Sequence, residues 1–202
     1  MHEVVRTVFW RRLDYPGAEY CQLRRRPDGW ELSGTVLVAL DGRPLRAHYQ
    51  VVCDAGWATR AVSLETLTGG TPRTLRLTAD EQRRWWSAGV ELVPLRGCVD
   101  VDLGVSPSTN TLPIRRLGLE IDAAVDIGAA WVRFPELEVT RLDQRYSRLN
   151  ASRYRYQSLP DGHAYAIEVD DLGLVRRYED GWECVAVDDA RAMDEAGKEE
   201  PR

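Results

Sequence analysis

Two runs of alternating apolar and polar residues, joined by an Asp-Gly turn, constrain the fold of this chain most strongly. From Trp30 to Leu40 the even positions are apolar or glycine, and polar residues stand between them up to Thr35. After Asp41-Gly42 the alternation resumes from Leu45 to Cys53. Side chains of a strand point to opposite faces in turn, and Asp-Gly is a favoured two-residue hairpin turn. The sequence therefore predicts a long β-hairpin.

Neighbouring segments extend this pattern and add one short helix. A third strand is expected near Ala58 to Leu67, before the Gly-Gly-Thr-Pro break at residues 69–72. The tetrad Thr78-Ala79-Asp80-Glu81 matches a capping box, and Gly89 follows a few residues later. We therefore predict a short helix from about Asp80 to Ser87.

The second half of the chain loosely repeats the first. Pro27-Asp28-Gly29-Trp30 has a counterpart in Pro160-Asp161-Gly162-His163, and each opens an alternating strand. We expect two similar meander halves, about residues 10–95 and 98–187, within one domain of residues 1–187. A meander of this kind cannot bury its own apolar face, so it has to roll against its copy. Residues 188–202, with six acidic and three basic residues, are expected to form a disordered charged tail.

The charge balance disfavours nucleic-acid binding. The formal charge of the chain is −5, of which −3 lies in the tail, so the rest carries only −2. Such a surface has no excess of cations to displace counterions from a phosphate backbone. No run of about 18 apolar residues is present, and the N-terminus lacks the apolar core of a signal peptide. We expect a cytoplasmic protein without a transmembrane segment.

The cysteines and histidines do not form a metal-binding pattern. Four cysteines are spread over Cys21, Cys53, Cys98 and Cys184 without a close pair, and only three histidines are present. A structural zinc site needs clustered thiolates or imidazoles. We therefore expect reduced, mostly buried thiols, no metal and no organic cofactor.

The segment Cys98–Leu117 carries the densest group of polar side chains. Asp100 and Asp102 are two residues apart, so a strand projects both from one face, and Arg115 or Arg116 is the expected cationic partner of each. Short polar residues from 106 to 111 favour turns, and Pro113 favours an extended Leu112. Two interpretations remain open, a structural loop with ion-paired carboxylates or the mouth of a pocket.

This segment also resembles the core of a family of bacterial glycolipid-binding proteins. The strings Asp-Val-Asp-Leu-Gly at 100–104 and Thr-Asn-Thr-Leu-Pro-Ile-Arg-Arg-Leu at 109–117 carry the likeness. Weaker matches extend it from about Arg12 to Val187, whereas Ser106 and Ser108 depart from the pattern. The resemblance implies an antiparallel spiral β-roll, mainly β, built from two similar meander halves around an interior groove that takes lipid-like or glycolipid-like molecules.

The expected function is therefore binding of an amphipathic small molecule in that groove. Val36, Val38, Val51, Val101 and Ile167 would supply its apolar face. The residues expected to contact the ligand are Trp57, Arg60, Asp100, Asp102, Thr109, Asn110, Thr111, Arg115, Trp131, Gln144, Tyr146, Tyr154 and Tyr156.

The alternative is a cavity enzyme, such as a cyclase, isomerase or hydrolase, acting on an apolar substrate. No GxSxG, HExxH, P-loop or GxGxxG motif is present, which favours the binding protein over the enzyme. If the chain is an enzyme, its acid or base should be Asp100, Asp102 or Glu19, because paired carboxylates do acid–base work when their surroundings separate their pKa values.

Overall fold

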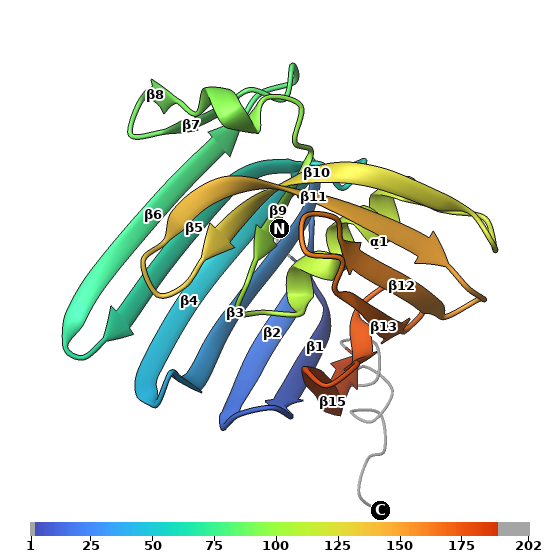
Figure 1. The fold of residues 1–202 in the computed structure, drawn as a ribbon, viewed down its shortest axis with the longest axis horizontal. Coiled ribbons are helices and arrows are strands. Elements are labelled where there is room, and N and C mark those ends of the chain that lie inside the picture. The colour runs from blue at the N-terminus through green and yellow to red at the C-terminus, as the bar shows by residue number, and fades with distance from the viewer. Residues whose placement is uncertain (1–2, 190–202) are drawn as a thin grey trace, which may run out of the picture.

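The computed structural model describes residues 3–189, which form a single curled sheet of fifteen strands (Figure 1). Spatial order runs β8-β7-β6-β5-β4-β3-β2-β1-β15-β14-β13-β12-β11-β10-β9. Neighbouring strands are antiparallel except β9 and β10, which are parallel. The strands are β1 (Glu3–Arg12), β2 (Gly17–Arg26), β3 (Gly29–Leu40), β4 (Arg43–Asp54), β5 (Thr59–Thr68), β6 (Thr71–Ala79), β7 (Trp85–Ser87), β8 (Val90–Glu91), β9 (Asp100–Leu103), β10 (Ala124–Arg133), β11 (Glu138–Arg148), β12 (Arg153–Ser158), β13 (Ala164–Val169), β14 (Val175–Tyr178) and β15 (Trp182–Asp189).

Two halves of the sheet, β1–β8 and β9–β15, join where β1 pairs with β15. The sheet curls so that β9 and the helix α1 (Thr111–Leu117) lie between the halves (Figure 1). The start of β9 also reaches the N-terminal half, since Thr59 N–H donates to Val99 O and Val101 N–H donates to Thr59 Oγ1, both at 3.1 Å. The mainly β, roll-like architecture expected from the sequence is thus confirmed.

The long hairpin is confirmed, and its turn explains why. β3 and β4 pair from Gly29 to Leu40, with Asp41 and Gly42 both at positive φ between them. Positive φ at both central residues gives the turn a twist that matches the flanking strands. The third predicted strand is also confirmed, as β5, and Gly69-Gly70 forms the next turn at positive φ.

The helix predicted from Asp80 to Ser87 is wrong, because this segment forms a tight turn followed by β7. The Asp80 carboxylate accepts the backbone N–H of Arg84 at 2.9 Å and its guanidinium at 2.8 Å, which closes a loop instead of capping a helix. Arg83 lies at positive φ, which no right-handed helix accommodates. Trp85 then pairs with β6 and is fully buried, so tertiary packing overrides the local capping signal.

The extended Leu112 predicted before Pro113 is also wrong, because Leu112 lies in α1, the only α-helix among residues 3–189. Pro113 occupies the first turn, where its missing N–H has no helical acceptor to lose. Leu112 and Ile114 are buried between the two halves of the sheet, and Gly118 ends the helix in the left-handed conformation. Burial of these two side chains explains why the helix forms despite the proline.

The core is continuous across both halves. The five residues expected to supply an apolar groove, Val36, Val38, Val51, Val101 and Ile167, are packed within this core, and only Val38 also lines a concavity, at the ends of the hairpins. Two fully buried tryptophans of the N-terminal half donate their indole N–H groups to backbone carbonyls, one in β14 and one in the segment just before β9. Trp10 donates to Val175 O at 2.6 Å, and Trp85 to Cys98 O at 2.8 Å.

The four cysteines are free thiols. Cys21, Cys53 and Cys98 are buried, and Cys184 is half-buried.

The last strand, β15, continues to Asp189, so the first two residues of the predicted tail belong to a strand. Residues 190–202 lie outside the described residues. Within residues 3–189, no helix has the length and apolar composition that crossing a bilayer requires.

Candidate functional site

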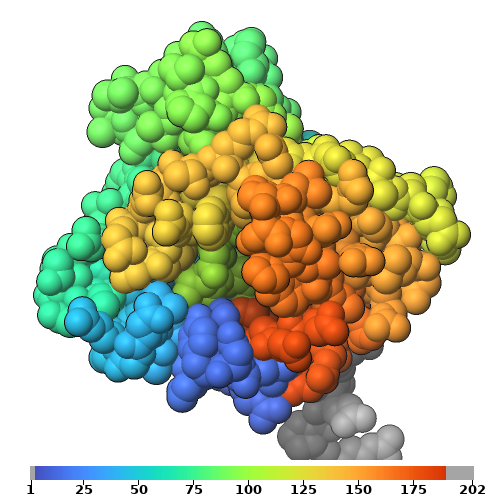
Figure 2. Space-filling view, in the orientation of Figure 1, coloured from blue at the N-terminus to red at the C-terminus, as the bar shows by residue number. Residues whose placement is uncertain are grey.

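A cleft of about 660 Å³ opens on the C-terminal half of the sheet. Figure 2 shows the hollow between β10 and β11, the β1–β2 turn and the C-terminal strands. Residues of β1 and of every strand from β9 to β15 line it, together with the β1–β2 turn, the loop after β9 and the turns before β13 and β15. This volume falls in the range of small-molecule sites.

A hydrogen-bonded loop, residues 104–110, forms one wall of the cleft. Thr109 Oγ1 accepts the backbone N–H of Leu103 at 3.1 Å, and Asn110 Oδ1 accepts the hydroxyl of Tyr146 at 2.8 Å. Gly104 has no room for a side chain, since a Cβ there would lie 2.9 Å from the indole nitrogen of Trp131. These contacts fix the loop against β9–β11 and hold Trp131 beside it.

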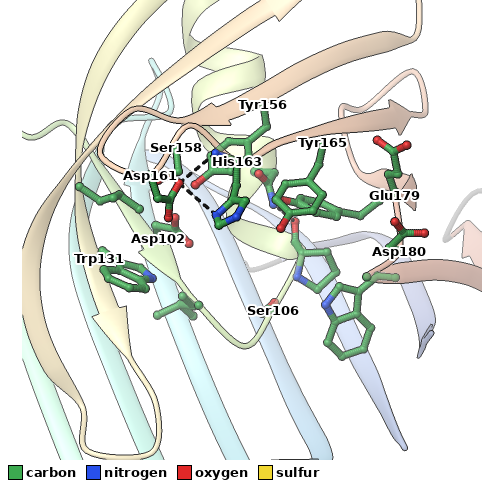
Figure 3. Close-up of a pocket in the computed structure, with 18 of the residues that line it drawn as sticks. Asp102, Ser106, Trp131, Tyr156, Ser158, Asp161, His163, Tyr165, Glu179 and Asp180 are labelled. Carbon is green, nitrogen blue, oxygen red and sulfur yellow. Dashed lines mark hydrogen bonds and ion pairs between the residues drawn. The ribbon is translucent and has the colours of Figure 1, made fainter. Parts of the chain in front are cut away.

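Asp102 is the least exposed of the acidic side chains that line the cleft. It lies on β9 opposite Trp131 of β10, and its Oδ2 accepts the Gln144 side-chain amide at 2.6 Å. Burial raises the pKa of Asp102 to about 6, although the hydrogen bond from Gln144 opposes the shift. Figure 3 shows its carboxylate beside Trp131 and Asp161 in the cleft. A carboxylate with such a pKa in a cleft is a typical functional group.

Asp100, two residues earlier, has a different environment. Its side chain is 2% exposed and its two carboxylate oxygens accept Nε and Nη2 of Arg116, at 3.0 and 2.5 Å. Arg116 as partner of Asp100 was predicted correctly. An arginine partner for Asp102 is wrong, because Arg115 instead lies over the ring of Trp57, 5.4 Å from its centroid. Sequence spacing alone does not fix which arginine reaches which face.

Four tyrosines form an aromatic wall across successive strands. Tyr146 of β11, Tyr156 of β12 and Tyr165 of β13 are paired in register, and Tyr178 of β14 packs against the last two. Their ring centroids are 5.4–6.3 Å apart. Tyr156, Tyr165 and Tyr178 line the cleft, with Trp131 and Trp182 elsewhere on its surface. The cleft therefore combines aromatic faces with polar groups.

The turn before β13 adds an acid–base pair to the rim. Asp161 accepts the backbone N–H of His163 at 3.0 Å, and its carboxylate lies 3.3 Å from the His163 ring nitrogen Nδ1 (Figure 3). Both side chains are mostly exposed. The pKa of Asp161 is lowered, mainly by the backbone hydrogen bond from His163. Asp161 therefore stays ionised at the mouth of the cleft.

Glu19 lies behind the loop and does not line the cleft. Its Oε1 accepts the hydroxyls of Tyr49, at 2.5 Å, and Ser106, at 2.8 Å, and the side chain is fully buried. Its Oε2 has no hydrogen-bond partner among the described residues. Burial raises the pKa of Glu19 to about 8, so the carboxyl is mostly neutral at pH 7. Ser106, one of the departures from the family pattern, connects this group to the cleft wall.

The structure brings only part of the expected ligand-contact set to the cleft. Asp102, Asn110, Trp131 and Tyr156 line it. Gln144, Tyr146 and Thr109 lie directly behind these residues and bond to them or to the adjacent backbone. The residues that do not line the cleft are Trp57, Arg60, Asp100, Thr111, Arg115 and Tyr154.

Most of these other residues have structural partners. Trp57 stacks on Trp30 with centroids 4.6 Å apart, and Arg60 pairs with Asp54 at 2.8 Å. Tyr154 is buried under Arg148. Thr111 is buried at the start of α1. The two-residue alternation does place Tyr154 and Tyr156 on one face, but the curvature of the sheet leaves only Tyr156 at the cleft.

Sequence reasoning missed several residues that line the cleft. They are Arg12, Asp14, Ser158, Tyr165, Glu179 and Asp180. The signal for Tyr165 was present, since the Asp161-Gly162 turn places it opposite Tyr156 in a hairpin. Asp180 and Glu179 lie in a turn and were not distinguished from ordinary turn residues. No group of three His, Cys, Asp or Glu side chains suited to a metal ion occurs in residues 3–189.

A second concavity, of about 710 Å³, lies at the ends of the hairpins. It is lined by Pro16, Gly17, Leu37, Pro44, Leu67 and neighbouring small or apolar residues, with Arg46 as its only charged group. The first cleft is the better candidate site, because functional pockets combine an apolar lining with several convergent polar groups.

The fold and the site together describe a β-roll protein with a polar and aromatic cleft in its C-terminal half. Residues 7–184 match the family described as "Putative glycolipid-binding", and the chain belongs to that family. It is also similar to the crystal structure of a DUF1089 family protein from Pseudomonas aeruginosa, at 33% sequence identity and a TM-score of 0.72. That likeness covers 79% of this chain and 88% of the other. No curated protein matches the chain.

Proposed function

We propose that this protein binds an amphipathic, glycolipid-like small molecule whose polar headgroup enters the cleft. The observation that carries the proposal is the convergence of Asp102, Asn110 and Ser158 with the rings of Trp131 and Tyr156 in one cleft. Carboxylate, amide and hydroxyl groups bond sugar hydroxyls, while aromatic faces cover the apolar faces of a sugar ring. The family to which the chain belongs supports the same ligand class.

Apolar residues of the cleft would hold the first part of an alkyl chain. Leu103, Pro107, Leu142 and Pro160 lie among the polar lining residues. Each buried methylene contributes about 0.8 kcal/mol before ordering costs, so a few buried methylenes add substantially to the affinity of the headgroup.

Titration with octyl glucoside below its micelle concentration tests this proposal. Native mass spectrometry and calorimetry of the wild type should show one bound molecule, and Trp131→Ala should weaken binding about tenfold, as loss of an aromatic anchor does. Trp86→Ala is a matched control, because both rings are half-buried and each lies under an arginine, at 5.2 Å for Arg84 over Trp86 and 5.4 Å for Arg133 over Trp131.

Trp86 lies outside the cleft, so its removal should leave the affinity for octyl glucoside unchanged. Equal weakening by the two substitutions, or no binding to the wild type, would contradict the proposal.

Acid–base catalysis by Asp102 is the second candidate function. Of the three carboxyls expected to act in an enzyme, only Asp102 lines the cleft, and its pKa of about 6 is close to neutral. Asp100 is held by Arg116, and Glu19 lies behind the loop. Recovery of chemically altered ligand from the wild type, but unaltered ligand from Asp102→Asn, would support this candidate over passive binding.

A further inference from the structure

We propose that the headgroup taken by this cleft carries a positively charged amine. This inference rests on the proposed function, since it specifies the charge of the ligand that the same cleft binds. Three features of the cleft support it: the pairing of its cations, the environment of Asp102 and the arrangement of its aromatic rings.

The cations of the cleft are already paired, whereas acidic side chains exceed them. Five carboxylates line the cleft against two arginines and one histidine. Arg12 pairs with Asp14 at 2.6 Å, Arg141 with Asp143 at 2.8 Å, and His163 lies beside Asp161. A phosphate or carboxylate headgroup would therefore enter a negative field and would have to displace an existing ion pair.

Asp102 supplies a half-buried acceptor that lacks a cationic partner in the described part of the chain. Its one recorded hydrogen bond comes from the neutral Gln144 amide. Around it stand Tyr146 and Tyr156, whose phenols are neutral at pH 7, and burial raises the pKa of both further above its ordinary value of 10.0. An uncompensated carboxylate in such a site gains most from a ligand cation, which restores the charge balance lost on burial.

The aromatic wall adds a second contact for a cation. Tyr156, Tyr165 and Tyr178 form a contiguous group at the cleft surface, and Figure 3 shows Tyr156 and Tyr165 on the side of the cleft that holds His163. A cation over such ring faces is attracted by their quadrupoles, most strongly where water is excluded. Carboxylate and rings together favour an ammonium group over an anion.

Three octyl glucosides that differ only in one substituent test the inference. The first is unmodified, the second has an aminomethyl group in place of the hydroxymethyl group, and the third has a carboxylate there. At about pH 7.5, calorimetry should show the amine binding about tenfold more tightly than the neutral glycoside, a difference of ~1.4 kcal/mol, and the carboxylate binding most weakly.

Asp102→Asn should reduce the ratio of amine to neutral affinity to about one, because the isosteric amide carries no charge. Asp126→Asn is the matched control, since it removes one carboxylate from the exposed Asp126–Arg145 pair outside the cleft and should keep the wild-type ratio. The wild type gives an independent measurement, because amine affinity should fall as the pH drops through about 6, where Asp102 becomes protonated.

Over that range the groups around Asp102 are Gln144 and Tyr146 on β11, Tyr156 on β12, Tyr178 on β14, and the Asp161–His163 pair at the mouth. Asp102→Asn should remove the pH dependence that belongs to Asp102, and any pH dependence left in this variant comes from other groups of the cleft.

Equal binding of the amine and the neutral glycoside, or an amine preference that survives in Asp102→Asn, would overturn the inference and leave the proposed function standing. No binding of any of the three ligands would overturn both.

Discussion

The inner faces of the two halves of the sheet differ in what they are made of. In the N-terminal half, Leu32, Val36, Val51 and Leu64 are fully buried in the core. In the C-terminal half, the inner positions of β12–β14 include three tyrosines that reach the cleft. The same strand alternation therefore places mainly apolar side chains on the inner face of one half, and tyrosines that line a cleft on the inner face of the other.

Asp100 and Asp102 show the same contrast within one strand. Asp100 is neutralised by Arg116 inside the structure, whereas Asp102 is bonded by a neutral amide and faces the cleft. The first should therefore matter mainly for stability, and the second mainly for ligand binding. Loss of a carboxyl should accordingly cost most stability where the group is buried and paired, as at Asp100, and least where it is exposed, as at Asp126.

Asp100→Ala should lower the free energy of unfolding by about 3 kcal/mol, because it leaves the largely buried Arg116 guanidinium without its partner. Urea denaturation of the variant and the wild type measures this difference. Adding Arg116→Leu should restore part of the loss, since the unpaired charge is then removed as well. An unchanged denaturation midpoint in Asp100→Ala would show that the pair does not stabilise the fold.

Glu19→Gln should remove a pH dependence of stability above pH 6. The folded-state pKa of Glu19, about 8, lies above its ordinary value of 4.5, so folding favours the protonated form. Stability from this group is complete below the ordinary value and is lost as the pH rises through about 8, with a slope of up to ~1.4 kcal/mol per pH unit. Because the pKa of Asp102 is about 6, the stabilities of the two proteins should be compared above that pH, where Asp102 stays ionised.

Urea denaturation at about pH 6.5 and about pH 9 checks this prediction. The difference in the free energy of unfolding between the two conditions is compared with the slope expected for one titrating group. The wild type and the control Glu65→Gln, which changes an exposed residue of β5, should both lose stability between the two conditions. Glu19→Gln should lose less. Equal losses in all three proteins would contradict a neutral Glu19 in the fold.

Asp126→Asn should have the smallest effect. The carboxylate forms an exposed cross-strand pair with Arg145, with about half of each side chain exposed. Water and salt screen such pairs, so the melting temperature should stay within the scatter of repeat measurements. Calorimetry in low and high salt checks this outcome, and a clear drop at both salt concentrations would show that surface pairs matter more than the comparison with Asp100 allows.

Local patterns in the sequence predicted the strands well, because alternation and turn residues act over a few positions. The β3–β4 hairpin follows from Trp30 to Leu40 and from Asp41-Gly42 without any tertiary information. The helix predicted over Asp80–Ser87 is wrong because burial of Trp85 decides the conformation of this segment. That burial depends on residues outside the segment, such as Cys98. The helix α1 was missed because Leu112 and Ile114 are stabilised by both halves of the sheet.

The candidate site could be predicted only in part, since its residues come together through long-range strand pairing. Asp102 and Trp131 were identified from the sequence, but the partner of Asp102 is Gln144, 42 residues away along the chain. Arg12 reaches the cleft because β1 pairs with β15, a contact between opposite ends of the chain. Nothing in the local sequence indicates that Gln144 reaches Asp102 or that Arg12 reaches the cleft.

We expect the cleft of the C-terminal half to bind the ligand with Asp102 facing its headgroup. The most direct test is a crystal structure of the protein with the aminomethyl octyl glucoside. Density for the headgroup is expected between Trp131 and Tyr156, with the amine within hydrogen-bonding distance of the Asp102 carboxylate. Density in the second concavity, around Leu37 and Leu67, with the cleft empty, would contradict this expectation.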